Sequence, residues 1–251
     1  MCGLAGVLLA PGERSAALWD EIRDVFTRNL LANEKRGKEA SGVALIQQDG
    51  GFTILKQPLP ASALVQTTAY RDLLRQLGPA TTCLLGHTRL PTKGSAAQNA
   101  NNHPLHAGQV IGVHNGHIEN DDTLFARLDL PRQGQVDSEI IFSLLDTISD
   151  YSVRGAYLEA VRQRMLLLEG KFTTLSVDLR HPTRLLAIKN GEPLSVYYHS
   201  PLHMYCFSSR YLFLRETFGD AVVTKPLSAR HAYLFDVAAS AREPLSLPII
   251  D

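Results

Sequence analysis

A cysteine is the second residue of the chain, in Met1-Cys2-Gly3, directly before the apolar run 4–9. If Met1 is removed, Cys2 carries both a thiol and a free α-amine. A thiol is a strong nucleophile only as the thiolate, and an α-amine, whose pKa is about 8, can take the thiol proton directly or through one water. Position 2 therefore predicts an N-terminal nucleophile, provided that other residues supply what its chemistry needs.

Three further polar clusters stand at the ends of apolar strand-like runs, and they contain suitable partners. Asn115 and Gly116 can supply two hydrogen-bond donors to an oxyanion from one tight turn, where glycine allows close approach. Arg89 has the planar fork that suits a carboxylate, and Asp137 offers an anion for an ammonium group. A substrate with an amino-acid head would need such a cation for its carboxylate and such an anion for its ammonium group. The clusters are 86–94, 114–120 and 136–139.

Composition limits the classes of function. The 251 residues contain 25 Lys and Arg and 25 Asp and Glu, so no net field favours nucleic acid or an anionic membrane. Three cysteines predict a reducing compartment without a disulfide framework, and Cys83 and Cys206 lie in apolar strand-like runs, as buried residues do. No apolar stretch reaches spanning length. We expect a cytoplasmic protein that contacts neither nucleic acid nor membrane.

The periodicity predicts short strands in hairpin order with helices grouped between them. A helix over 15–33 has apolar residues at helical spacing. Residues 88–108 have no periodicity, so we expect a loop there that is either functional or disordered. This order favours an α+β fold with antiparallel sheets. Strands are expected at 2–10, 43–46, 52–56, 81–87, 109–114, 172–178, 184–190, 194–199, 204–208, 221–225 and 232–237, and further helices at 62–77, 120–128, 138–149, 154–168 and 209–217.

Six motifs in one order resemble a known family. With them, the chain resembles the glutaminase domain of class II glutamine amidotransferases, within the N-terminal nucleophile hydrolases. The final third also resembles the family in 170–172, 189–194 and 207–209. The six motifs are Met1-Cys2-Gly3, Arg36-Gly37 through Ser41-Gly42, His87-Thr88-Arg89 with Thr92 and Gly94, Asn102-His103-Pro104, His114-Asn115-Gly116 with Ile118 and Asn120, and Asp137-Ser138-Glu139.

The resemblance implies a role for each matching residue. Cys2 matches the nucleophile that forms a γ-glutamyl thioester and releases ammonia, and Asn115 with Gly116 matches the oxyanion hole. Arg89, with Thr92 beside it, matches the residue that holds the glutamine α-carboxylate. Asp137 matches the residue that binds the α-ammonium. The implied fold is a four-layer αββα sandwich, and the implied reaction needs no cofactor.

The chain departs from any one branch of the family. Position 90 is Leu where many relatives have an aromatic residue, and Lys93 replaces a histidine of one branch. The chain ends soon after the last expected strand, so we expect one domain over 1–251 and no acceptor domain. The expected function is a stand-alone glutaminase that hydrolyses L-glutamine and passes ammonia to a separate acceptor enzyme.

Two alternatives stay open at this point. A γ-glutamyl amide or peptide hydrolase would use the same chemistry, and Leu90 leaves room for a larger substrate. A non-catalytic glutamine-binding module would keep only the fold. His103 and His106 are three apart, but two imidazoles without a third ligand do not predict a metal site.

Overall fold

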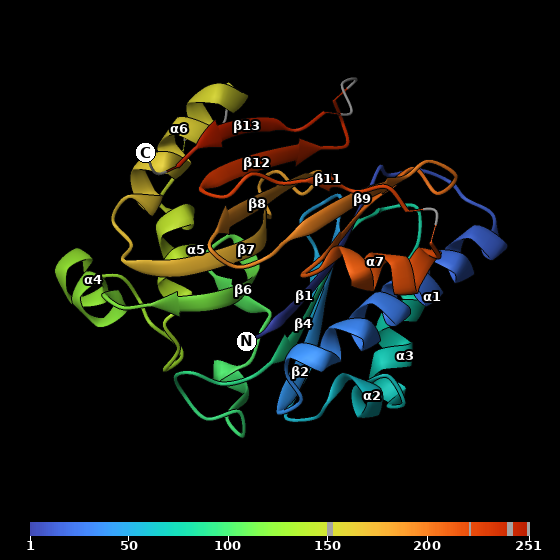
Figure 1. The fold of residues 1–251 in the computed structure, drawn as a ribbon, viewed down its shortest axis with the longest axis horizontal. Coiled ribbons are helices and arrows are strands. Elements are labelled where there is room, and N and C mark those ends of the chain that lie inside the picture. The colour runs from blue at the N-terminus through green and yellow to red at the C-terminus, as the bar shows by residue number, and fades with distance from the viewer. Residues whose placement is uncertain (150–152, 221, 240–242, 250–251) are drawn as a thin grey trace.

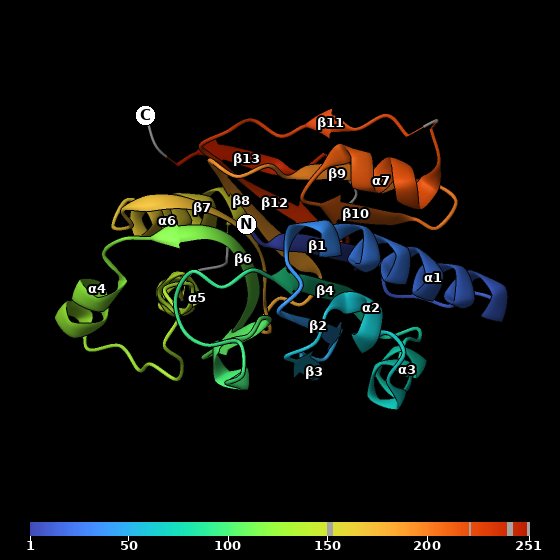
Figure 2. The same ribbon diagram turned by 60° about the horizontal axis from the view of Figure 1, so that its bottom comes forward.

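The computed structural model describes residues 1–149, 153–220, 222–239 and 243–249. Two antiparallel sheets lie face to face, and helices cover the outer face of each (Figures 1 and 2). This arrangement confirms the expected α+β fold with four layers. No helix in these residues combines the length and apolar character needed to cross a bilayer.

The first sheet has seven strands in the order β11-β9-β10-β1-β4-β2-β3. Its central strands β1 and β4 run antiparallel, with Gly3 opposite Thr88. The strands are β1 (Gly3–Leu9), β2 (Ala40–Gln47), β3 (Phe52–Gln57), β4 (Thr81–Arg89), β9 (Ser195–His199), β10 (Met204–Ser208) and β11 (Lys225–Pro226).

The second sheet has six strands in the order β13-β12-β8-β7-β6-β5. Its strand β6 lies against β1 and β4 of the first sheet, near the N-terminus (Figure 1). The strands are β5 (Leu105–Ala107), β6 (Val110–Ile118), β7 (Gly170–Asp178), β8 (Arg184–Asn190), β12 (His231–Asp236) and β13 (Leu245–Pro248).

The helices form the two outer layers. Figure 2 shows α1, α2, α3 and α7 on the side of the first sheet, and α5 and α6 on the side of the second. Helix α1 begins where the Ser15 side chain accepts a hydrogen bond from the Leu18 amide, which is an N-cap. The helices are α1 (Ala16–Asn33), α2 (Ala61–Leu64), α3 (Thr68–Arg75), α4 (Asp121–Leu128), α5 (Glu139–Asp146), α6 (Arg154–Met165) and α7 (Tyr211–Phe218).

Strand periodicity explains the layers. Successive side chains of a strand point to opposite faces, so β1 places Leu4 and Leu8 between the sheets and Val7 and Leu9 under the helices. All four are fully buried. A strand that is apolar on both faces can therefore lie only in the middle of such a sandwich.

The structure corrects several expected boundaries. The helix expected at 62–77 is two helices, α2 and α3, because Thr67 caps a new helix by accepting from the Tyr70 amide. The strand expected at 109–114 continues through Asn115 and Gly116 to Ile118, since all of them pair with β7. The expected loop contains the short strand β5, and β13 follows the last predicted strand. Of the strand expected at 221–225, only residue 225 belongs to a strand, the two-residue β11, and residue 221 lies outside the described residues.

Candidate active site

The two central strands of one sheet and one strand of the other bring the predicted residues together. Cys2 directly precedes β1, whose Gly3 pairs with Thr88, so Cys2 lies next to the end of β4 at Arg89. Strand β6 carries Asn115 and Gly116 in from the second sheet. Residues more than a hundred positions apart therefore meet at one end of the sandwich.

Three contacts hold Cys2 in place. Its backbone N–H donates to Asn115 Oδ1 at 2.9 Å, and its carbonyl accepts from Arg36 Nε at 2.6 Å. Its Sγ lies 3.5 Å from the carbonyl oxygen of Leu90. Burial raises the pKa of the Cys2 thiol, while the hydrogen bond to Leu90, the chain's terminal amine and Arg89 act in the opposite direction. The thiol therefore needs a base to become a thiolate near neutral pH.

Asn115 contacts an acidic residue that sequence reasoning did not assign. Its Nδ2 donates to Glu192 Oε2 at 3.2 Å, and the same oxygen pairs with Arg36 Nη2 at 3.3 Å. An amide nitrogen has two hydrogens, so Asn115 keeps one for an oxyanion. Glu192 and Arg36 thus orient both Asn115 and Cys2. The only sequence signal for Glu192 was its place in the motif 189–194.

Gly116 is required by the backbone at this point. Its φ is +139°, a region that L side chains rarely adopt, and a Cβ there would clash with the carbonyl oxygen of Lys171. Glycine therefore allows β6 to pass close to β7 while Gly116 also lines the pocket beside Cys2.

Arg89 is buried, and its guanidinium holds the loop that follows β4. Nη1 donates to Asn102 Oδ1 at 2.8 Å, and Nη2 donates to the carbonyls of Lys93 and Gly94 at 2.7 and 2.9 Å. These bonds use three of the five N–H groups of the guanidinium, so a substrate carboxylate can bind Arg89 without displacing the loop carbonyls.

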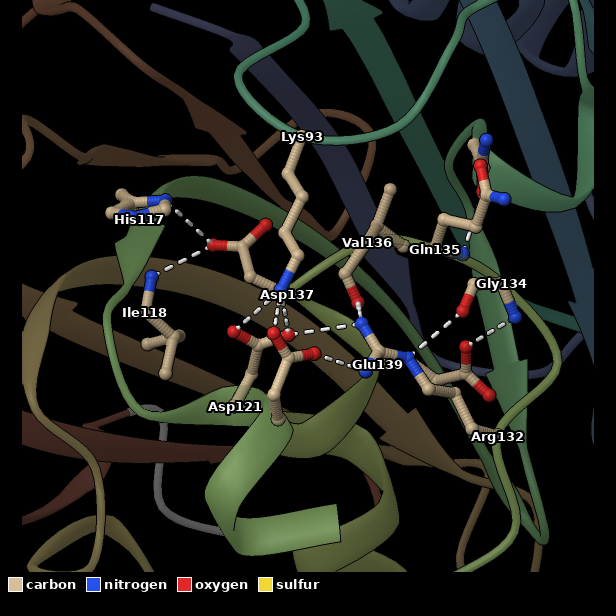
Figure 3. Close-up of polar contacts among 12 residues, drawn as sticks. Lys93, His117, Ile118, Asp121, Arg132, Gly134, Gln135, Val136, Asp137 and Glu139 are labelled. Carbon is tan, nitrogen blue, oxygen red and sulfur yellow. Dashed lines mark hydrogen bonds and ion pairs between the residues drawn. The ribbon is translucent and has the colours of Figure 1, made fainter. Parts of the chain in front are cut away.

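Asp137 is the anion of the pocket, and it lies just before α5. Its Oδ2 accepts from the Ile118 amide at 2.7 Å and lies 3.4 Å from Nδ1 of the exposed His117 (Figure 3). These contacts orient a carboxylate that is only 3% exposed. Asp137 and Arg89 line the same pocket, where Arg89 lowers the pKa of the Cys2 thiol and Asp137 raises it.

The pocket at Cys2 is closed in this structure. Its volume is about 20 Å³, which is room for one water molecule and far too little for an amino acid. Part of its wall is the loop after β4, which contributes Leu90, Thr92 and Lys93. A substrate can enter only if this loop moves. The residues from the prediction that line the pocket are Cys2, Arg89, Thr92, Gly116 and Asp137.

Four charged residues, which we call the loop latch, tie that loop to α4. Lys93 Nζ lies 2.7 Å from Asp121 Oδ2 and 3.0 Å from Asp122 Oδ2, and Arg132 pairs with the same two carboxylates (Figure 3). Asp121 is buried, with only 3% of its side chain exposed. Lys93 and Arg132 compensate the charge of this buried carboxylate, and the Lys93 ion pair fixes the loop to α4.

Three buried histidines lie close together at the pocket, and two of them, His103 and His114, line it. His87 and His103 stack with ring centroids 4.3 Å apart, and His114 Nδ1 lies 2.7 Å from Ser138 Oγ. Burial lowers the pKa of His87 to about 3 and that of His114 to about 4, so both are neutral near pH 7. Among the described residues, no group of three or more His, Cys, Asp or Glu could hold a metal ion.

Comparison of sequences identifies relatives that are longer than this chain. Glutamine–fructose-6-phosphate aminotransferase of Yersinia pseudotuberculosis is 28% identical over 255 aligned residues, which cover 97% of this chain and 38% of that protein. The enzyme of that name from Shigella flexneri is 29% identical over 201 residues, or 78% of this chain and 30% of the relative. The chain thus spans less than half the length of these relatives. No protein-family model matches it.

Solved structures share the fold at low sequence identity. The B. subtilis glutamine phosphoribosylpyrophosphate amidotransferase, complexed with ADP and GMP, superposes with a TM-score of 0.73 at 16% identity, covering 99% of this chain and 49% of that one. A glutamine aminotransferase class-II domain protein from Silicibacter pomeroyi gives a TM-score of 0.63 at 14% identity, and the match covers 98% of both chains.

Proposed function

Since this chain is a class II glutamine amidotransferase domain with the N-terminal nucleophile hydrolase fold, we propose that it hydrolyses L-glutamine to L-glutamate and ammonia. The observation that carries the proposal is that Cys2, Gly116, Arg89 and Asp137 line one pocket, while Asn115 accepts a hydrogen bond from the Cys2 amide. These five residues come from four separate segments. Their types match the needs of a thiol nucleophile and of an amino-acid substrate.

The proposed reaction begins with loss of Met1. The freed α-amine of Cys2 takes the proton from Sγ, and the thiolate attacks the γ-carbonyl carbon of glutamine. Asn115 and Gly116 donate to the oxyanion of the tetrahedral intermediate. The C–N bond then breaks, the α-ammonium gives its proton to the leaving nitrogen, and ammonia departs. Water attacks the thioester, restores the thiol and releases glutamate.

Specificity rests on two charged side chains, Arg89 and Asp137, which line the pocket with Cys2. Arg89 holds the α-carboxylate of glutamine and Asp137 holds its α-ammonium, with Thr92 beside Arg89. The pocket must widen before glutamine can enter, because it is too small for an amino acid in this structure, and the loop after β4 forms part of its wall.

The proposed destination of the ammonia is a separate acceptor enzyme, with this chain acting as a single stand-alone domain. The solved chain from Silicibacter pomeroyi supports a protein of this size, because the match covers 98% of it. The three cysteines are free thiols, in keeping with a cytoplasmic location.

Glutamate release from L-glutamine tests the proposal. The protein is treated with a methionine aminopeptidase, and intact mass confirms that Cys2 is the first residue. We expect release by this protein and by Cys83→Ala, which changes a buried thiol away from the pocket, and none by Cys2→Ala. Equal release by Cys2→Ala would refute the assignment of the nucleophile. No release by the processed wild type would count against a glutaminase.

Arg89→Lys tests the substrate anchor. Lysine keeps the charge but loses the fork, so we expect kcat/KM for glutamine to fall at least ten-fold, mainly through KM. The matched control is Arg71→Lys on the surface of α3. Unchanged catalytic efficiency in Arg89→Lys would contradict the assignment. Competition by γ-glutamyl peptides measures whether the pocket prefers a larger substrate.

A further inference from the structure

A second, larger cavity adjoins the pocket at Cys2. Its volume is about 330 Å³, within the range of small-molecule sites, and Leu90 forms a wall of both cavities. We call it the basic pocket. Its lining residues come from the N-terminus, the end of α1, the loop after β4 and the start of α7: Met1, Lys35, Arg36, Leu90, Arg210 and Phe213.

The basic pocket has an uncompensated positive charge. Lys35 pairs with Glu216 at 2.7 Å, and Arg36 pairs with Glu192 at 3.3 Å. Arg210 has no ion pair with any carboxylate of the described residues. The three side-chain cations therefore exceed their two carboxylate partners by one, and the terminal amine of the chain adds a further positive charge.

Arg36 is the strongest sign of an absent ligand. Its side chain is only 4% exposed, and its Nη1 has no hydrogen-bond partner, although Nε and Nη2 are both engaged. A buried donor without an acceptor is unfavourable. After burial and the opposing effect of Glu192, repulsion by Arg210 also lowers the pKa of Arg36. An anion between the two guanidinium groups would relieve both penalties.

The remaining walls are apolar. Leu90 is 41% exposed and Phe213 is buried, and Met1 adds to this wall only until it is removed. Helix α7 begins at Tyr211 without a side-chain cap, so its first amides add a positive end to the same site. The lining therefore suits a ligand that has one anionic group and a short apolar body.

We propose that the basic pocket binds a small organic anion, whose carboxylate or phosphate group lies between Arg36 and Arg210. The apolar part of the ligand packs on Leu90 and Phe213. Arg36 also donates to the carbonyl of Cys2 and pairs with Glu192, which accepts from Asn115. A bound anion therefore acts on the nucleophile through Arg36. The effect on glutamine turnover rests on the proposed function, whereas binding itself does not.

Calorimetric titration of the protein without Met1, the form used in the glutaminase assay, tests the binding at constant ionic strength. The probes are phenyl phosphate, phenylacetate and inorganic phosphate. We expect phenyl phosphate or phenylacetate to bind more tightly than inorganic phosphate. Whichever of these two ring-bearing probes binds more tightly identifies the anionic group of the ligand. Arg210→Met should weaken binding at least ten-fold, and Arg71→Met on α3 should leave it unchanged.

Two results would overturn the inference: no measurable binding of any probe, or equal binding by wild type and Arg210→Met. Glutamate release with and without the best probe then tests the coupling. A rate that changes in the wild type and not in Arg210→Met supports it. Anion binding by a chain that releases no glutamate would keep the inference and count against the proposed function alone.

Discussion

Replacing Lys93 by methionine tests whether the loop latch keeps the pocket closed. The substitution retains an apolar side chain of similar length and removes the charge that joins the loop to Asp121 and Asp122. The hydrogen bonds of Lys93 Nζ go to these two carboxylates and not to Cys2, so the substitution acts on the pocket through the loop. We expect the loop to open more often.

The magnitude follows from the burial of the two partners. A hydrogen bond between charged groups contributes about 1.5–3 kcal/mol when it is well shielded. The Lys93 side chain is 30% exposed, and Arg132 stays 2.9 Å from Asp121 after the change, so we reduce this to about 1–2 kcal/mol. That free energy corresponds to a roughly 5- to 30-fold larger open population.

Amide hydrogen exchange measures this population. The amide of Gln135 lies outside the loop, donates to Asn101 Oδ1 within it at 2.8 Å, and becomes free when the loop leaves. Its exchange should accelerate by the same roughly 5- to 30-fold, while amides inside β4 stay unchanged. Lys38→Met, which changes an exposed lysine outside the latch, is the control. Unchanged exchange of the Gln135 amide in Lys93→Met would refute the latch.

Two further predictions concern stability. Gly116→Ala should lower the free energy of unfolding by about 2–5 kcal/mol in a urea titration, because the new Cβ meets the Lys171 carbonyl at a φ of +139°. Gly155→Ala, in α6 with open space around it, should change it by no more than about 1 kcal/mol, and equal losses would contradict the reasoning. The pKa of His114 falls from 6.5 unfolded to about 4 folded, so the unfolded chain binds more protons between these values. The free energy of unfolding should therefore decrease as the pH is lowered from 6.5 to about 4, by up to about 1.4 kcal/mol per pH unit for this histidine. His114→Gln should reduce that slope, and an unchanged slope would argue against a buried neutral imidazole.

Local sequence was enough to predict the central elements of the fold. The run after Cys2 is apolar on both faces of a strand, and the helix after Ser15 has a cap and an apolar stripe, so each is specified by residues within a few positions. The prediction failed where contacts with residues distant in the sequence decide how far a strand extends. Asn115 and Gly116 resemble a turn, yet they continue β6, because β7 supplies a partner to every residue of that segment.

The sequence by itself determined which residues carry the proposed chemistry, because a thiol at position 2, an arginine fork, an asparagine-glycine pair and a carboxylate are recognisable by type and order. Only the tertiary structure decided how they are held. Glu192 orients Asn115 across 77 positions, Arg36 holds Cys2 across 34, and Lys93 closes the pocket through α4. Such contacts depend on which distant strands and loops the sandwich places together. Burial in the sandwich then shifts pKa values, as at His114, which is neutral near pH 7.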